Sequence, residues 1–219
     1  MPDADIRFPI AVLVSGSGTN LQAILDKVHR RDGIAVVGVV SSKPGVKAIA
    51  RAERAGIDTA VFEASAYPDR ATRDKKMAAW LHERGVQLVV LAGFMELLTP
   101  GFLGAFADRV INVHPALLPA FSGARPVDDQ LAYGVKVSGV TVHFVDEGVD
   151  SGPIILQEPV RLPHAGGREA VLERLHQVEH ELLPRAIRLL ALGAVSFDPD
   201  NPRFVHADES VLKDGSGNE

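Results

Sequence analysis

Two polar side chains, the amide of Asn112 and the imidazole of His114, lie at the end of the apolar run Val110–Val113. Side chains two apart on a β-strand point to the same side, so this amide and this imidazole can converge. Pro115 follows at once and would end the strand. Together the two groups can donate hydrogen bonds to an oxyanion, and the imidazole can also move protons. The alternative interpretation is a capping Asn beside a surface His.

Asp150 is a carboxylate that could support this imidazole. It precedes Ser151-Gly152-Pro153 and a further apolar run. Adjacent strand ends of an α/β sheet can bring distant residues together, and ligands usually bind there. A carboxylate beside an imidazole favours the protonated form of the ring. An Asp before Gly-Pro is also a common turn residue, so both interpretations stay open.

The segment Ser15–Asn20 reads Ser-Gly-Ser-Gly-Thr-Asn between an apolar run and a helical pattern. Glycines let an anion approach the backbone, and a helix N-terminus offers free N–H groups with a partial positive charge. The segment therefore fits a phosphate site as well as it fits a plain turn with Thr19 or Asn20 as the N-cap. It has neither the spacing of a dinucleotide fingerprint nor the Lys of a P-loop.

A single carboxylate, Glu179, stands on the apolar side of the last predicted helix. The stripe comprises Leu172, Leu175, Leu182 and Leu183 at helical spacing. A carboxylate there needs a partner or a wet cleft, unless it lies at the edge of the stripe and reaches solvent.

Short apolar runs alternate with helical patterns and would position these groups. Strands are predicted at 10–14, 35–40, 88–91, 110–113, 141–145 and 154–156, and helices at 21–30, 46–55, 70–84, 100–106 and 168–192. Continuous β-branched runs indicate strands covered on both faces, so the fold class is α/β with a doubly wound, mostly parallel sheet. Only Asp146–Pro153 joins the last two strands, which predicts antiparallel pairing near the C-terminal half. We expect one domain at 8–197 and a flexible tail at 198–219.

Composition narrows the class of function. The 219 residues include no Cys, carry a formal net charge of −5 and are 46% hydrophobic. Absence of Cys suits a reducing compartment, and we expect a cytoplasmic protein. The negative charge gives no general attraction to nucleic acid or anionic membrane, and no apolar run reaches membrane-spanning length. The eight His are scattered, so no metal site is predicted, and small-molecule substrates are expected.

Four motifs in this order resemble the phosphoribosylglycinamide formyltransferase family, the 10-formyltetrahydrofolate-dependent enzymes of purine biosynthesis. The resemblance covers residues 9 to 195, and the combination is highly specific. The motifs are Ser15–Gln22, Leu91–Met95, Ile111–Pro119, and Thr141–Asp146 followed by Asp150–Ile155.

The resemblance implies a Rossmann-like formyltransferase fold and roles for the matching residues. Asn112 and His114 would stabilise the tetrahedral intermediate, and Asp150 would keep His114 protonated. Acceptor-binding residues would be Gly18, Thr19 and Asn20 at the phosphate, with Glu179 at the amine or ribose side. Folate-binding residues would be Arg70, Met95, Glu96, Leu97, Leu98, Asn112, Asp146, Glu147, Gly148, Val149 and Asp150. The family implies 10-formyltetrahydrofolate as co-substrate, no metal, and a monomer or homodimer.

The loop Ala120–Val127 departs from the family, because Arg125 stands where a His is typical. Gly-Ala-Arg-Pro is similar to the corresponding loop of formyltetrahydrofolate hydrolase, which gives the formyl group to water. That hydrolase is the first alternative, although we expect no regulatory domain before the first strand and the phosphate turn is intact. A non-catalytic phosphate-binding α/β module is the second, but it leaves Asn112, His114 and Asp150 unexplained. Methionyl-tRNA formyltransferase is disfavoured because the sequence shows no basic signal for tRNA.

Overall fold

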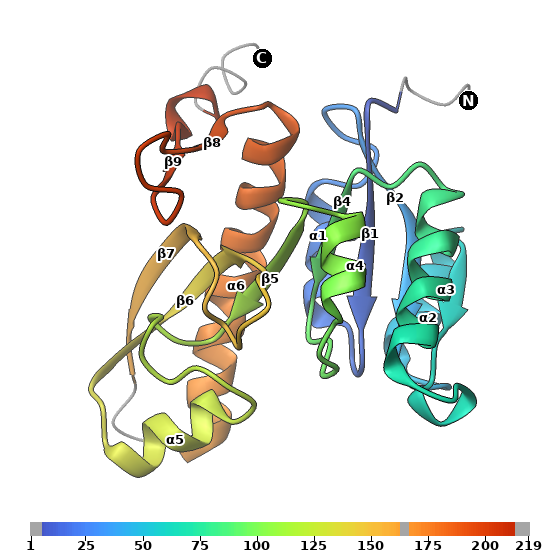
Figure 1. The fold of residues 1–219 in the computed structure, drawn as a ribbon. Helices are drawn as coiled ribbons and strands as arrows, with labels where there is room; N and C mark the ends of the chain where they lie inside the picture. The colour runs from blue at the N-terminus through green and yellow to red at the C-terminus, as the bar shows by residue number, and fades with distance from the viewer. Residues whose placement is uncertain (1–5, 163–166, 213–219) are drawn as a thin grey trace. The chain divides into compact units, whose positions relative to one another are not determined.

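The computed structural model describes residues 6–162 and 167–212. The chain divides into two compact units, Met1–Asn112 and Val113–Glu219, and each is described on its own. Figure 1 shows the chain coloured from its N-terminus to its C-terminus. Strand β5 begins in the first unit and ends in the second.

The first unit is built on parallel strands. They are β1 (Phe8–Val14), β2 (Ile34–Ser41), β3 (Thr59–Val61), β4 (Leu88–Leu91) and β5 (Val110–His114). Strand β1 pairs with β2 and β4, β3 pairs with β2, and β4 pairs with β5, all in parallel. Residues Ile10–Val14 are fully buried. That burial explains a continuous apolar run, because a strand covered on both faces has no side that favours polar residues.

Helices follow the strands of this unit. They are α1 (Thr19–Lys27), α2 (Lys47–Arg54), α3 (Arg70–His82) and α4 (Pro100–Ala105), with a 3₁₀ turn η1 at Ala64–Ala66. Helix α1 packs against α2, and α3 packs against α4. Right-handed crossovers put helices on opposite faces where the direction of strand addition reverses, which here is between β1 and β4. Ligands of such sheets bind beyond the carboxyl ends of the strands at that reversal.

The second unit combines a hairpin with a long helix. Its elements are α5 (Pro126–Tyr133), β6 (Val137–Phe144), β7 (Ile154–Arg161), α6 (Gly167–Ala191), β8 (Val195–Phe197), β9 (Val205–Ala207) and the 3₁₀ turn η2 (Glu209–Leu212). Strands β6 and β7 pair antiparallel, and α6 packs against both. Strands β8 and β9 form a separate antiparallel pair. In hydrogen-bond order the main sheet reads β3-β2-β1-β4-β5-β6-β7.

The predicted fold class is confirmed, including the antiparallel hairpin. Strand β7 is longer than predicted because its main-chain pairing with β6 continues to Arg161 after the apolar run has ended. Of the predicted tail, Val205–Ala207 forms β9, and residues 213–219 lie outside the described residues. The single domain at 8–197 stays a prediction. In the described part of the chain, no helix has the length and apolar character that crossing a membrane requires.

Candidate active site

A histidine and an aspartate meet in the second unit. His114, the last residue of β5, places its Nδ1 3.4 Å from Oδ2 of Asp150. The opposite ring nitrogen, Nε2, lies 2.8 Å from the carbonyl oxygen of Phe121. A carbonyl can only accept, so Nε2 carries a hydrogen in this arrangement. Nδ1, on the other side of the ring, faces the carboxylate, so both ring nitrogens of His114 lie toward acceptor oxygens.

A second imidazole, that of His143, faces the same carboxylate. Its Nε2 lies 3.7 Å from Oδ1 of Asp150, and its Nδ1 lies 2.7 Å from the carbonyl oxygen of Phe144. Burial lowers the pKa of His143, against the raising effects of the Phe144 carbonyl and of Asp150. His143 is therefore neutral at neutral pH. His143 was not predicted as a site residue, because a lone His inside an apolar strand is more often part of the core.

The loop between β6 and β7 presents Asp150 in an unusual conformation. Its φ of 50° lies in the left-handed region, which Asp tolerates better than most residues. Asp146 holds the loop by accepting hydrogen bonds from Gly148 N, at 3.1 Å, and from Ser151 Oγ, at 2.6 Å. Strained backbone held in place by its neighbours is typical of functional loops. Asp150 also accepts from the backbone N–H of Gly123, at 2.8 Å.

Two further predicted site residues, Asn112 and Glu179, lie on β5 and α6. Asn112 is half-buried on β5, and strand alternation puts its side chain on the same side as that of His114. Glu179 lies on α6 and is only 4% exposed, so it is a buried carboxylate and not a stripe-edge residue in solvent. Among residues 6–162 and 167–212, no group of three or more His, Cys, Asp or Glu side chains could hold a metal ion.

The predicted phosphate turn lies in the first unit, between β1 and α1. Gly18 is the residue before the helix and adopts a left-handed φ of 71°. A Cβ on Gly18 would lie 2.7 Å from Cβ of Ala48, so the turn sits directly against α2. The side chain of Ser15 ties this turn to neighbouring strand ends: its Oγ lies 2.6 Å from Oγ of Ser42 and accepts from Met95 N at 2.9 Å.

The folate candidates of the first unit follow β4, at the other side of the strand reversal. Met95 and Leu97 are exposed, at 67% and 57%. The almost fully buried pair Arg73 and Asp74 of α3 holds this segment: Asp74 accepts from Thr99 N at 2.7 Å, and Arg73 Nη1 lies 3.3 Å from Glu96 Oε2. Leu98 is half-buried, and Arg70, the first residue of α3, is exposed.

The other folate candidates belong to the second unit, in the loop that carries Asp150. Glu147, Gly148 and Val149 are exposed there, and Asp146 is half-buried. Arg125, which departs from the family pattern, points to solvent with 75% of its side chain exposed and pairs with Asp129 at 3.8 Å.

Comparison with known proteins assigns the class. Residues 8–187 match the formyl transferase family. The chain therefore belongs to that family.

Its relatives narrow the assignment. It is 38% identical to phosphoribosylglycinamide formyltransferase of Bacillus subtilis, over 82% of this chain and 93% of that protein. It is 43% identical to the trifunctional purine biosynthetic protein adenosine-3 of Gallus gallus, but spans only 19% of that longer relative. The crystal structure of glycinamide ribonucleotide transformylase 1 from Symbiobacterium toebii is 41% identical, with a TM-score of 0.87 over 94% of this chain and 99% of that one. Within the family, the chain belongs with the phosphoribosylglycinamide formyltransferases.

Proposed function

We propose that this protein transfers the formyl group of 10-formyltetrahydrofolate to the amine of 5-phosphoribosylglycinamide, a step of purine biosynthesis. The observation that carries the proposal is the contact between His114 and Asp150 at the end of β5, in a chain of this family. The same sheet reversal that organises the first unit supports a ligand site at its strand ends.

The reaction sets two tasks for the protein. The acceptor amine attacks the formyl carbon, a new C–N bond forms, and negative charge develops on the formyl oxygen. The bond from that carbon to the folate nitrogen then breaks, and a proton passes from the attacking nitrogen to the leaving one. Asn112 and His114 would donate hydrogen bonds to the oxyanion, and each such donor is worth on the order of 3 kcal/mol in the transition state.

Asp150 would support His114 in both tasks. Its carboxylate oxygen lies 3.4 Å from Nδ1 and would hold the ring in position for these steps. In the structure, the hydrogen on His114 Nε2 is directed at the Phe121 carbonyl. That carbonyl must move away before Nε2 can donate to a formyl oxygen, so the loop that holds it would shift when substrates bind.

Each substrate is assigned its own residues in this proposal. Acceptor residues are Gly18, Thr19 and Asn20 for the phosphate, and Glu179 for the amine or ribose side. Formyl-donor residues are Arg70, Met95, Glu96, Leu97, Leu98, Asn112, Asp146, Glu147, Gly148, Val149 and Asp150. A cytoplasmic location, a single domain at 8–197, and a monomer or homodimer complete the proposal.

One assay with purified protein separates the candidate functions. Formyl donor is supplied with and without glycinamide ribonucleotide, and both products are measured. We expect loss of the donor's formyl group only when the ribonucleotide is present, with formylated ribonucleotide as product. Consumption of donor at the same rate without it would indicate the hydrolase that the Arg125 loop suggests. No consumption in either case would leave a binding module.

The catalytic role of Asp150 is tested by Asp150→Asn, which keeps the shape of the side chain and removes its charge. We expect single-turnover formyl transfer to fall by about 100-fold or more, with little change in affinity for the ribonucleotide, because the ring that Asp150 supports acts mainly in the transition state. The control is Asp58→Asn, which removes a carboxylate that is 69% exposed and lies 3.2 Å from Arg84. Thermal melts accompany the kinetics. An Asp150→Asn protein that melts early but transfers formyl at the parent rate would show that Asp150 is only a turn residue.

A further inference from the structure

Helix α2 makes direct contact with the Gly-rich turn of the first unit. The backbone N–H of Ala48 donates to the carbonyl oxygen of Gly16, at 3.2 Å. The side chain of Arg51 donates through Nε to the carbonyl oxygen of Ser17, at 3.0 Å. Two successive carbonyl groups of the turn are thus directed toward α2.

These contacts fix the direction of two N–H groups. In a planar trans peptide the C=O and the following N–H point in opposite directions. Because the carbonyls of Gly16 and Ser17 point to α2, the N–H groups of Ser17 and Gly18 point away from it. Within the described residues, neither N–H donates to a protein acceptor. Outward N–H groups beside the start of a helix are the donors that a phosphate site uses.

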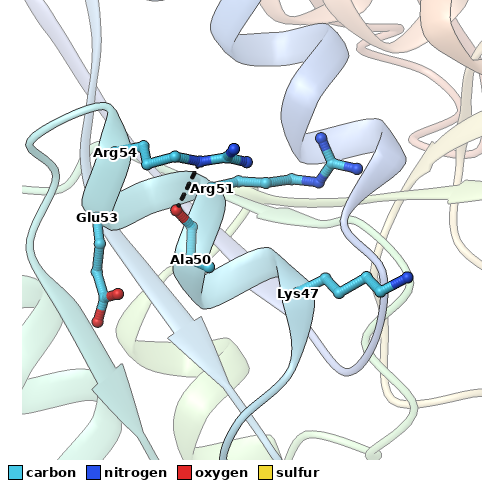
Figure 2. Close-up of a pocket in the computed structure, with 5 residues that line it drawn as sticks. All are labelled: Lys47, Ala50, Arg51, Glu53 and Arg54. Carbon is cyan, nitrogen blue, oxygen red and sulfur yellow. Dashed lines mark hydrogen bonds between the residues drawn. The ribbon is translucent and has the colours of Figure 1, made fainter.

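Arg51 donates hydrogen bonds through two of its guanidinium nitrogens, Nε and Nη1. Besides the bond to Ser17, its Nη1 donates to Oε1 of Gln22 on α1, at 2.8 Å, and Gln22 in turn donates to Asp26, at 2.9 Å. Figure 2 shows Arg51 extending away from α2, whereas the neighbouring Arg54 turns back to the Ala50 carbonyl of its own helix, at 3.2 Å. Both arginines line the same basic hollow, but only Arg51 bonds to the turn.

We propose that Arg51 is a positioning residue for the acceptor phosphate. It holds the Ser17 carbonyl toward α2 and thereby directs the N–H of Gly18 at the phosphate, without itself needing to touch that group. Planar, two-point hydrogen bonding of this kind is specific to a guanidinium, so Lys is no equivalent substitute. The inference rests on the proposed function, since the phosphate is that of glycinamide ribonucleotide.

The experiment compares Arg51→Gln with Arg54→Gln in the full chain. Both changes remove one positive charge from α2, but only the first releases the turn. In Arg51→Gln we expect KM for the ribonucleotide to rise about ten-fold, the equivalent of one charged hydrogen bond, with kcat and KM for the formyl donor near parent values. Arg51→Lys can reach one acceptor and should give an intermediate KM. Arg54→Gln should match the parent.

Amide hydrogen exchange of the turn is measured on the same proteins without substrates. The amides of Ala48 and Gln22 report on the turn, because they donate to the carbonyl oxygens of Gly16 and Gly18. We expect both amides to exchange faster in Arg51→Gln and at the parent rate in Arg54→Gln. Equal rises of KM in both variants would overturn the inference, because charge alone would then explain the effect. Unchanged KM in Arg51→Gln, or a loss confined to kcat, would overturn it as well. A parent protein that does not formylate the ribonucleotide would instead refute the proposed function, and exchange alone would then decide whether Arg51 holds the turn.

Discussion

Gly18 offers a quantitative test of how the phosphate turn is packed. Replacing it by Ala adds a Cβ 2.7 Å from Cβ and 2.9 Å from Cα of Ala48, and the second contact is with backbone that cannot rotate away. The residue also has a φ of +71°, where Ala is strained. Two costs therefore add: a backbone cost of roughly 1–2 kcal/mol and an overpacking cost of roughly 1–3 kcal/mol.

Gly85 provides a matched control for the backbone cost. Its φ is +65°, and an added Cβ would meet nothing within 4 Å. Gly85→Ala should therefore lose only the backbone cost, about 1–2 kcal/mol. The difference between the two variants isolates the contact with α2, and we expect it to be about 1–3 kcal/mol.

Urea unfolding of the free protein measures both losses, and steady-state kinetics measures the consequence for the acceptor. We expect Gly18→Ala to raise KM for the ribonucleotide, because the turn must move off α2, and Gly85→Ala to leave it unchanged. Equal losses of unfolding free energy in the two variants would refute the packing argument. A large loss with unchanged KM would separate the turn from phosphate binding.

Two further predictions concern pH and loop motion. Burial, followed by the charge of Arg30, lowers the pKa of His29 from its usual 6.5, and its Nδ1 accepts from Val36 N. Neutral His29 stabilises the fold fully above pH 6.5, and this stabilisation is lost as the pH falls below 6.5. An Asn side chain can accept the same hydrogen bond without titrating, so His29→Asn should lose less unfolding free energy than the parent between about pH 7 and about pH 5. Equal losses in parallel urea titrations would contradict this prediction. We also expect residues 122–127 to gain protection from hydrogen exchange when both substrates bind, as a closing loop requires, and equal protection in the free and bound states would count against closure.

How far the sequence predicted the fold depended on burial. Strand β1 was predictable because burial on both faces selects an uninterrupted apolar run. A short helix was expected after the loop at 122–127 but the bounds of α5 were not predicted, and the β8–β9 pair was not predicted at all. In α5 only Val127 and Gln130 are buried, and Gln130 is held by a hydrogen bond from Ser138 and by its own bond to the Pro115 carbonyl. Polar tertiary contacts of this kind leave no periodic pattern in the sequence.

Some residues of the candidate site could be predicted from the sequence and others could not. The convergence of His114 and Asp150 followed from strand ends and loop position, and the structure brings the two side chains together. His143 was missed because an isolated His in an apolar strand is usually a core residue, and only the position of Asp150 gives it significance. The contact of Arg51 with Ser17 joins residues 34 positions apart, which no spacing rule indicates.

The hydroxyl group of Ser15 has a consequence for how such an enzyme can change. It bonds at once to Ser42 and to the backbone of Met95, and so links the turn assigned to the acceptor with the segment assigned to the formyl donor. A substitution that reshapes one of these segments displaces the other through a single buried atom. Under the proposed assignments, acceptor preference and donor preference are therefore coupled in this protein. Redesign for a new acceptor must keep a small hydroxyl residue at position 15 or compensate on both sides together.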